Sequence, residues 1–391
     1  MLDSALADVG HRKSNGKYCH RIWPERMHSA QGGIMSSWSA LSATTSFCVG
    51  LIVASAAFSE ERAGLFIPHA GMQFTTAFTN DFGRDAESLT TVTSVTGTAV
   101  SIDYSSSRGV AVHRELLVTD RQGASSYVLG YEADMPTLIP GTTSLGISAR
   151  VLSELRSEGR ARLTLVYSPK LDSIECTLTR VSSSEMMRLI VEDRIVEVPS
   201  VHARAQCGEG ARTASGDFYF ADDLNQPLLI ESVLNFSWEK RPRTERITRV
   251  IDGLGLHPDM EQSLRTIGQY DAYGLRFDFD SAVLRPESVR LVREIAQMLS
   301  TNADWRILIV GHTDSTGGPE YNIGLSDKRA EAVRLALVDY GVASERLRSE
   351  GRGETQSKAD NDSLAGRAIN RRVEFRRLDH NVIGSRPLDA E

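Results

Sequence analysis

The second half of the chain contains the stretch RILIVGHTDSTGGPEYNIGLSDKRAEAVRLALVDYG, residues 306–341, which decides its fold class. The run Ile307–Val310 is short and entirely apolar, as is typical of a central strand covered on both faces. Ser326 is a residue type preferred at helix N-caps, and Gly341 is suited to end a helix. Apolar residues recur between them at helical spacing: Ala330, Val333, Leu337 and Tyr340. The stretch therefore predicts a strand, a loop and a helix that buries these four residues.

The flanking sequence extends this alternation of strands and helices. Residues 275–279 alternate apolar and polar side chains, which predicts an opening strand. Pro286 suits the first position of a helix. An apolar stripe follows it: Leu291, Val292, Ile295, Met298 and Leu299. Val373 and Phe375 alternate with charged residues in a closing strand. The order of elements predicts an α/β two-layer sandwich over residues 264–378.

Residues 60–240 show the pattern of a different domain. Short runs that alternate apolar and polar residues, such as 99–104 and 162–167, are separated by turn residues. We therefore predict a multidomain chain whose N-terminal domain is antiparallel and all-β, either a sandwich or a small barrel. A basic linker is expected at 241–263 and a polar tail at 379–391.

The first 59 residues are interpreted as an upstream extension followed by a signal peptide. An apolar run begins at Phe47 and ends in small residues, where Ala54-Ser55-Ala56 fits the A-x-A cleavage pattern. No Lys or Arg lies between Met35 and this run, which is unusual for an export signal. An uncleaved anchor and a cytosolic chain are the alternatives.

The cysteines and the net charge restrict the chemistry further. Cys19 and Cys48 fall in the segment expected to be removed. The remaining Cys176 and Cys207 are expected to form a disulfide in an oxidising compartment, with two buried thiols as the alternative. No C-x-x-C pattern or closely spaced His pair accompanies them, so no metal site is predicted. The net charge of −7 argues against a nucleic-acid partner.

Several separated blocks of the C-terminal part resemble one known family. The blocks are Gly311-His312-Thr313-Asp314, Leu325-Ser326-Asp327-Lys328-Arg329-Ala330, Gly366-Arg367-Ala368 and Asn370-Arg371-Arg372-Val373-Glu374. Together they resemble the OmpA C-terminal motif, also found in Pal and MotB proteins, over residues 264–377. Two departures precede the closing strand: Ser357 stands where a proline is usual, and Ala365 where an acidic residue is frequent.

The resemblance implies non-covalent binding of peptidoglycan through the diaminopimelate of its stem peptide. The free end of that side chain carries one ammonium and one carboxylate, so its site needs an anion and a cation close together. Asp314 would accept hydrogen bonds from the ammonium. Arg329, expected in the first turn of the next helix, would hold the carboxylate with two parallel hydrogen bonds, aided by the positive helix start. A structural ion pair between the two residues is the alternative interpretation.

Further residues are candidates for the same site. Asn322 is expected to shape the loop and to contact the ligand only secondarily. Asp280 would line the pocket or cap a turn. Of the adjacent pair Arg371 and Arg372, one is expected at the site and the other in a salt bridge or in solvent, with Arg372 as the candidate for contact. His312 is interpreted as a hydrogen-bonded structural residue.

The resemblance also implies a location and partners. It indicates a periplasmic protein, associated with the cell wall or outer membrane, that anchors an envelope protein to the wall without a cofactor. The β domain is expected to engage another envelope protein, and the sequence indicates no oligomeric state. An alternative is a component of an envelope machine, such as a MotY-like flagellar stator-associated protein. A wall-acting enzyme is disfavoured, because no Ser/His/Asp or Cys/His constellation stands out.

Overall fold

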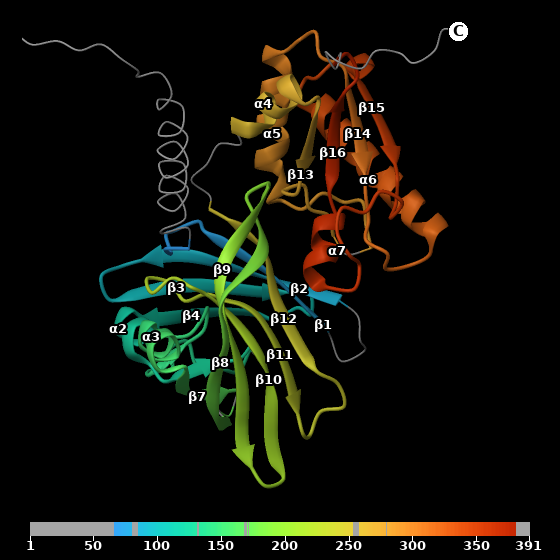
Figure 1. Cartoon of the computed structure of the whole chain (residues 1–391). Coiled ribbons are helices and arrows are strands. Elements are labelled where there is room, and N and C mark those ends of the chain that lie inside the picture. The colour runs from blue at the N-terminus through green and yellow to red at the C-terminus, as the bar shows by residue number, and fades with distance from the viewer. Residues whose placement is uncertain are drawn as a thin grey trace, which may run out of the picture. The chain divides into compact units, whose positions relative to one another are not determined.

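The computed structural model describes residues 66–79, 85–130, 133–167, 170, 172–252, 258–278 and 280–380 (Figure 1). The expected extension and signal peptide, with Cys19 and Cys48, lie outside these residues, as do positions 381–391 of the expected tail. Within the described ranges, no helix combines the length and apolar character needed to cross a membrane.

The N-terminal region forms a large, mostly antiparallel sheet. Its strands are β1 (Gln73–Thr79), β2 (Asp85–Val95), β3 (Ala99–Ser106), β4 (Ala111–Leu117), β5 (Ser126–Val128), β6 (Thr142–Thr143), β7 (Arg160–Val166), β8 (Ser173–Val191), β9 (Arg194–Glu209), β10 (Arg212–Ala221), β11 (Leu229–Phe236) and β12 (Arg243–Ile251). They lie in the order β4-β3-β2-β1-β12-β11-β10-β9-β8-β7-β5-β6. A parallel pairing of β8 with β12 closes strands β8 to β12 into a ring. The predicted β-rich N-terminal region is confirmed.

Two helices interrupt this sheet, α2 (Val118–Gly123) and α3 (Ala149–Glu158). The prediction of an all-β domain did not include them. Ser148 caps α3 by accepting a hydrogen bond from the Val151 backbone N–H. The apolar face of α3 joins the buried core of the sheet, because Val151 and Leu155 pack in the same cluster as Leu163.

The expected linker at 241–263 differs from the structure. Residues 243–251 form strand β12, which pairs with β1 and β11 inside the large sheet. The charged residues of this strand make it resemble a polar linker in the sequence. Arg246 is buried and paired with Glu231, while Ile247 and Val250 pack into the core. Because the charge of Arg246 finds a partner within the protein, this arginine does not mark an exposed segment.

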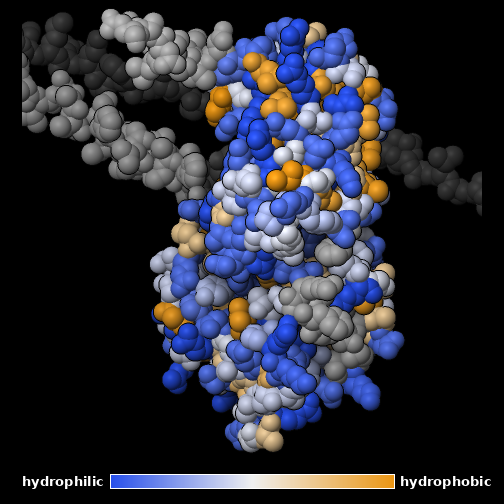
Figure 2. Space-filling view, turned by 90° about the vertical axis from the view of Figure 1, so that its right-hand side faces the viewer, coloured by the Kyte–Doolittle hydropathy of each residue, from blue (hydrophilic) through white to orange (hydrophobic). Residues whose placement is uncertain are grey.

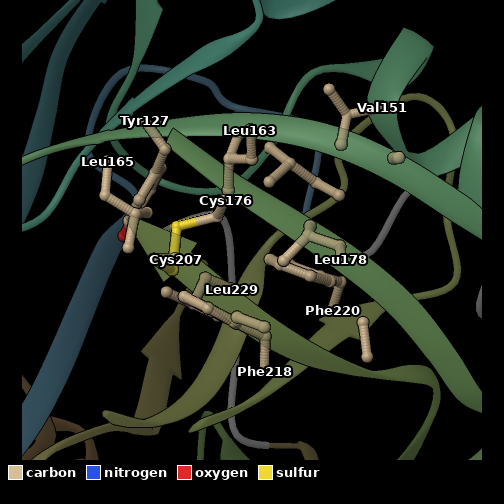
Figure 3. Close-up of a cluster of buried hydrophobic side chains, with 14 of the residues drawn as sticks. Tyr127, Val151, Leu163, Leu165, Cys176, Leu178, Cys207, Phe218, Phe220 and Leu229 are labelled. Atoms are coloured by element: carbon tan, nitrogen blue, oxygen red, sulfur yellow. A yellow bond between two sulfur atoms is a disulfide. The ribbon is translucent and has the colours of Figure 1, made fainter. Parts of the chain in front are cut away.

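The disulfide expected between Cys176 and Cys207 is present (Figure 3). The two residues face each other directly across strands β8 and β9, with their Cα atoms 4.0 Å apart. Both are buried in a cluster with Leu178, Phe218 and Phe220. The bond therefore ties two adjacent strands together at the centre of this core.

The C-terminal domain contains a four-stranded sheet in the order β13-β16-β14-β15 (Figure 1). The strands are β13 (Gln269–Ala272), β14 (Ile307–Gly311), β15 (Leu347–Gly351) and β16 (Val373–Arg377); the helices are α4 (Pro258–Thr266), α5 (Ser288–Thr301), α6 (Pro319–Asp339), the 3-10 turn η1 (Ser344–Arg346) and α7 (Leu364–Asn370). The apolar stripes of α5 and α6 share one core with the sheet residues Ile307, Ile309 and Phe375. This arrangement confirms the predicted α/β fold of two layers.

Several local expectations in this domain are wrong. The opening strand is β13, whereas Phe277 makes only an isolated bridge with Leu284. Helix α6 begins at Pro319 rather than near Ser326, because proline after Gly318 suits a first helical position. Tyr340 follows the end of α6 and is 44% exposed, so the buried stripe ends at Leu337.

The surface in Figure 2 is mostly hydrophilic, and its hydrophobic residues appear in small separate patches. Such scattered apolar exposure is normal for proteins in water. The described residues on this face therefore offer no extended apolar surface as a starting point for assigning a partner.

Candidate functional site

The candidate site lies where strand β14 ends against the middle of helix α6. Gly311 is the last residue of β14, and a Cβ atom placed on it would lie 2.1 Å from the backbone oxygen of Ser326. Gly351, at the end of β15, approaches the same helix, with 2.3 Å between such a Cβ and the Asp327 backbone nitrogen. The two glycines let both strand ends touch the helix backbone. This contact brings the segment after β14 close to Arg329.

Replacing Gly311 by alanine is expected to destabilise the C-terminal domain by about 1–3 kcal/mol, because the clash is with backbone that cannot turn aside. Chemical denaturation of the variant measures the effect. Gly324→Ala is the matched control, since Gly324 lies within α6 with open space around it. It is expected to stabilise the helix by about 0.5–1 kcal/mol. Equal effects of the two substitutions would contradict the close-packing argument.

Asp314 follows this junction and is 7% exposed. Its Oδ1 accepts a hydrogen bond from the Thr316 backbone N–H at 2.8 Å, and its Oδ2 accepts one from Arg371 Nη1 at 2.7 Å. Burial by itself would raise the pKa of Asp314, but the Arg371 guanidinium and the Thr316 hydrogen bond outweigh it and lower that pKa. The site therefore holds a carboxylate that stays ionised at neutral pH.

Arg329 is half-buried on α6 and is oriented by two contacts. Its Nε donates to the Ser281 carbonyl at 2.9 Å, and its guanidinium lies over the Phe277 ring at 5.1 Å. Among the described residues, neither terminal nitrogen of Arg329 has a hydrogen-bond partner, and no ion pair joins it to Asp314. The structural ion pair considered as an alternative is therefore not formed. The arrangement leaves a forked donor available, and its charge interacts with the ionised carboxylate of Asp314.

The environment of Arg329 differs from the expected one. Arg329 lies in the middle of α6, far from its first turn, so the positive helix start cannot assist it. The protonated form of Arg329 is instead stabilised by nearby acidic groups. Burial lowers the pKa of Arg329 and the Arg371 charge adds to this effect, while Asp314 and Asp280 oppose it.

The other predicted site residues take different positions. Asn322 is 1% exposed, and its Nδ2 donates to the Asp314 carbonyl and to Glu354 Oε2 at 3.2 and 2.7 Å. It therefore shapes the loop that carries Asp314. Asp280 is exposed with a positive φ of 54° and accepts a hydrogen bond from the Tyr321 hydroxyl.

Of the two adjacent arginines, Arg371 contacts Asp314 and Arg372 does not. The Arg372 side chain is 1% exposed and donates to Asp271 Oδ1 at 3.2 Å and to the Gln356 carbonyl at 3.0 Å. The alternation of side chains along the closing strand could have indicated that Arg371, and not Arg372, points toward Asp314. Arg372 shares a face with Glu374, which lies 3.8 Å from it, and so Arg371 projects the other way.

His312 has a structural environment. Its ring is buried, and Nε2 lies 3.2 Å from Glu374 Oε2. Burial lowers the pKa of His312. Within the described part of the chain, no group of three or more His, Cys, Asp or Glu side chains is placed to hold a metal ion.

Comparison with known proteins assigns the domain that carries this site. Residues 276–371 match the model of the OmpA family. Outer membrane protein A of Bordetella avium is 40% identical over 110 residues, which is 28% of this chain and 54% of that protein. The peptidoglycan-associated lipoprotein of Pseudomonas putida is 38% identical over 101 residues, covering 26% of this chain and 60% of that protein. The C-terminal part of this chain is therefore an OmpA family domain.

The other comparisons agree on the extent of the similarity. Peptidoglycan-binding protein ArfA of Mycobacterium bovis is 39% identical over 101 residues, 26% of this chain and 31% of that protein. The crystal structure of the peptidoglycan-associated lipoprotein from Burkholderia pseudomallei has 37% identity and a TM-score of 0.25, and covers 26% of this chain and 87% of that one. The chain thus spans 31–60% of the three relatives. By name, these relatives are an outer membrane protein, a peptidoglycan-associated lipoprotein and a peptidoglycan-binding protein.

Proposed function

We propose that this chain binds peptidoglycan non-covalently through the diaminopimelate of its stem peptide and so anchors an envelope protein to the cell wall. The observation that carries the proposal is that an ionised Asp314 and the forked donor of Arg329 interact electrostatically without forming an ion pair, and that the terminal nitrogens of Arg329 have no partner among the described residues. Asp314 receives the ligand ammonium, and Arg329 receives the carboxylate. The names of the relatives, which include a peptidoglycan-associated lipoprotein and a peptidoglycan-binding protein, support a binding function over an enzymatic one.

The remaining site residues have supporting roles in this proposal. Asn322 holds the Asp314 loop, and Asp280 lies at the rim beside Tyr321. The OmpA family domain, at about 264–378, is the wall-binding module. The β domain engages another envelope protein, in the periplasm after export by the N-terminal signal. Affinity for one stem peptide is modest, because a small zwitterion buries little area, but the repeating polymer favours rebinding.

The proposal is tested by comparing two types of isolated peptidoglycan. The chain is expected to be retained on sacculi whose stem peptides carry diaminopimelate. It is expected to bind at least about tenfold more weakly to peptidoglycan with lysine at that position, because the carboxylate that Arg329 would hold is missing. Equal retention on both materials would contradict recognition of the zwitterion.

A further inference from the structure

An acidic residue of the N-terminal sheet contacts Arg371, the arginine that pairs with Asp314. Glu87, on strand β2, accepts a hydrogen bond from Arg371 Nη2 at 3.1 Å through its Oε1. Its other oxygen accepts from Arg276 Nη2 at 2.6 Å. The side chains of Asp314, Arg371, Glu87 and Arg276 therefore form a continuous row of alternating charges.

Glu87 is ionised in this row of charges. Its side chain is 28% exposed, and burial by itself would raise its pKa. The charges of Arg276 and Arg371 outweigh that effect and lower the pKa to about 2. Glu87 also lies near enough to Arg329 to oppose the lowering of the Arg329 pKa. A negative charge thus pairs with Arg371 and acts electrostatically on Arg329.

Other contacts hold β2 and its neighbours against the OmpA family domain. Asp85, two residues before Glu87, accepts two hydrogen bonds from Arg367 at 2.6 and 3.0 Å. A small buried cluster joins Ile190 of β8 to Ala368 and Ile369 of α7. The position of Glu87 therefore does not depend on its own ion pairs alone.

We propose that Glu87 is an internal competitor for the carboxylate of the wall ligand, and that its contact with Arg371 is autoinhibitory. This inference rests on the proposed function. Glu87 presents the same chemical group, a carboxylate, to Arg371 beside Asp314, and its charge also acts on Arg329. The Glu87 carboxylate repels a ligand carboxylate held by Arg329. Tight wall binding requires Glu87 to withdraw, for example when a partner protein binds the N-terminal sheet and pulls β2 away.

The Glu87–Arg371 contact lowers the apparent affinity for the wall ligand. When only a fraction of molecules has the site open, the apparent dissociation constant is raised by the inverse of that fraction. In the closed state, Glu87 is hydrogen-bonded to Arg371 and Arg276. Removing the Glu87 charge destabilises this state, because these charge-assisted hydrogen bonds are weakened. A gain of about tenfold in apparent affinity follows from the usual strength of such bonds.

The test measures binding of the full chain to the tripeptide L-alanyl-γ-D-glutamyl-meso-diaminopimelate by calorimetry. Glu87→Gln keeps the size of the side chain and removes its charge, and is expected to lower the dissociation constant about tenfold. Asp85→Asn weakens the ion pair with Arg367, which lies outside the site and holds β2 against the OmpA family domain. It is expected to lower the dissociation constant as well, and it provides a second variant if Glu87→Gln folds poorly. Glu175→Gln, an exposed charge on β8, is the control and is expected to change nothing.

The outcomes separate this inference from the proposed function. Tighter binding by Glu87→Gln or Asp85→Asn, lost again on adding Arg329→Ala, supports the autoinhibitory contact. Unchanged or weaker binding by the folded variants, with wild-type binding still dependent on Arg329, overturns the inference and leaves the proposed function intact. Absence of tripeptide and sacculus binding by every version of the chain overturns both.

Discussion

Replacing Arg329 by alanine is expected to lower retention of the chain on diaminopimelate-containing sacculi by about 30-fold or more. Truncating one partner of a desolvated, hydrogen-bonded charge pair commonly costs about 2–5 kcal/mol, and each 1.4 kcal/mol is tenfold in affinity. Arg329 is half-buried and its guanidinium is held by the Ser281 carbonyl and the Phe277 ring, so its terminal donors are oriented before the ligand arrives. Quantifying bound and free protein after sedimentation with sacculi measures the loss.

The matched control for this prediction is the neighbouring Lys328→Ala. Lys328 lies on the same helix, is exposed, and carries the same charge, so its removal reproduces the change in net charge without removing the oriented fork. Its effect is expected to stay within about twofold, in line with an exposed charge. Arg329→Lys is expected to fall between the two, because lysine keeps the charge but cannot make two parallel hydrogen bonds.

Asp314→Asn tests the anionic half of the site in the same assay. Asparagine retains an oxygen for the Thr316 N–H but cannot supply the negative charge for the ligand ammonium. Its expected loss is comparable to that of Arg329→Ala, and circular dichroism of each variant controls for folding. Full retention by both Asp314→Asn and Arg329→Ala would refute the site assignment.

Removing the disulfide with the double substitution Cys176→Ala and Cys207→Ala is expected to lower the free energy of unfolding of the N-terminal region by about 3–4 kcal/mol. The bond joins residues 31 positions apart, and a closed loop of that length restricts the unfolded chain by this amount in the chain-entropy account. Chemical denaturation under non-reducing conditions measures the difference.

Two comparisons make the disulfide prediction specific. The wild-type chain in the presence of a reductant should approach the stability of the double variant. Sacculus retention should be unchanged, because the disulfide lies in the core of the large sheet, and the candidate site stands on the separate core of the OmpA family domain. Equal stability of the oxidised wild type and the double variant would show that the bond restricts the unfolded chain very little.

Particular residues show where prediction from the sequence succeeded. The apolar run at Ile307 and the helical stripe from Ala330 to Leu337 identified β14 and α6, because burial on one face imposes a period that local sequence displays. Prediction failed at β12, where paired arginines within a buried strand resemble an exposed linker. It failed also at the start of α6, where Ser326 has the chemistry of an N-cap but packs inside the helix against Gly351.

The sequence by itself determined the alternation of strands and helices that contains β14 and α6, because burial on one face imposes a period on the local sequence. The resemblance of its motif blocks to one family indicated the domain family and the two groups proposed to bind the wall. Only the tertiary structure decided that Arg371 and not Arg372 meets Asp314, and that Glu87 faces the same guanidinium. Glu87 and Arg371 are 284 residues apart, and no local pattern encodes such a contact. It arises from the packing of two domains, where the energy of a buried charge depends on partners brought from elsewhere in the chain.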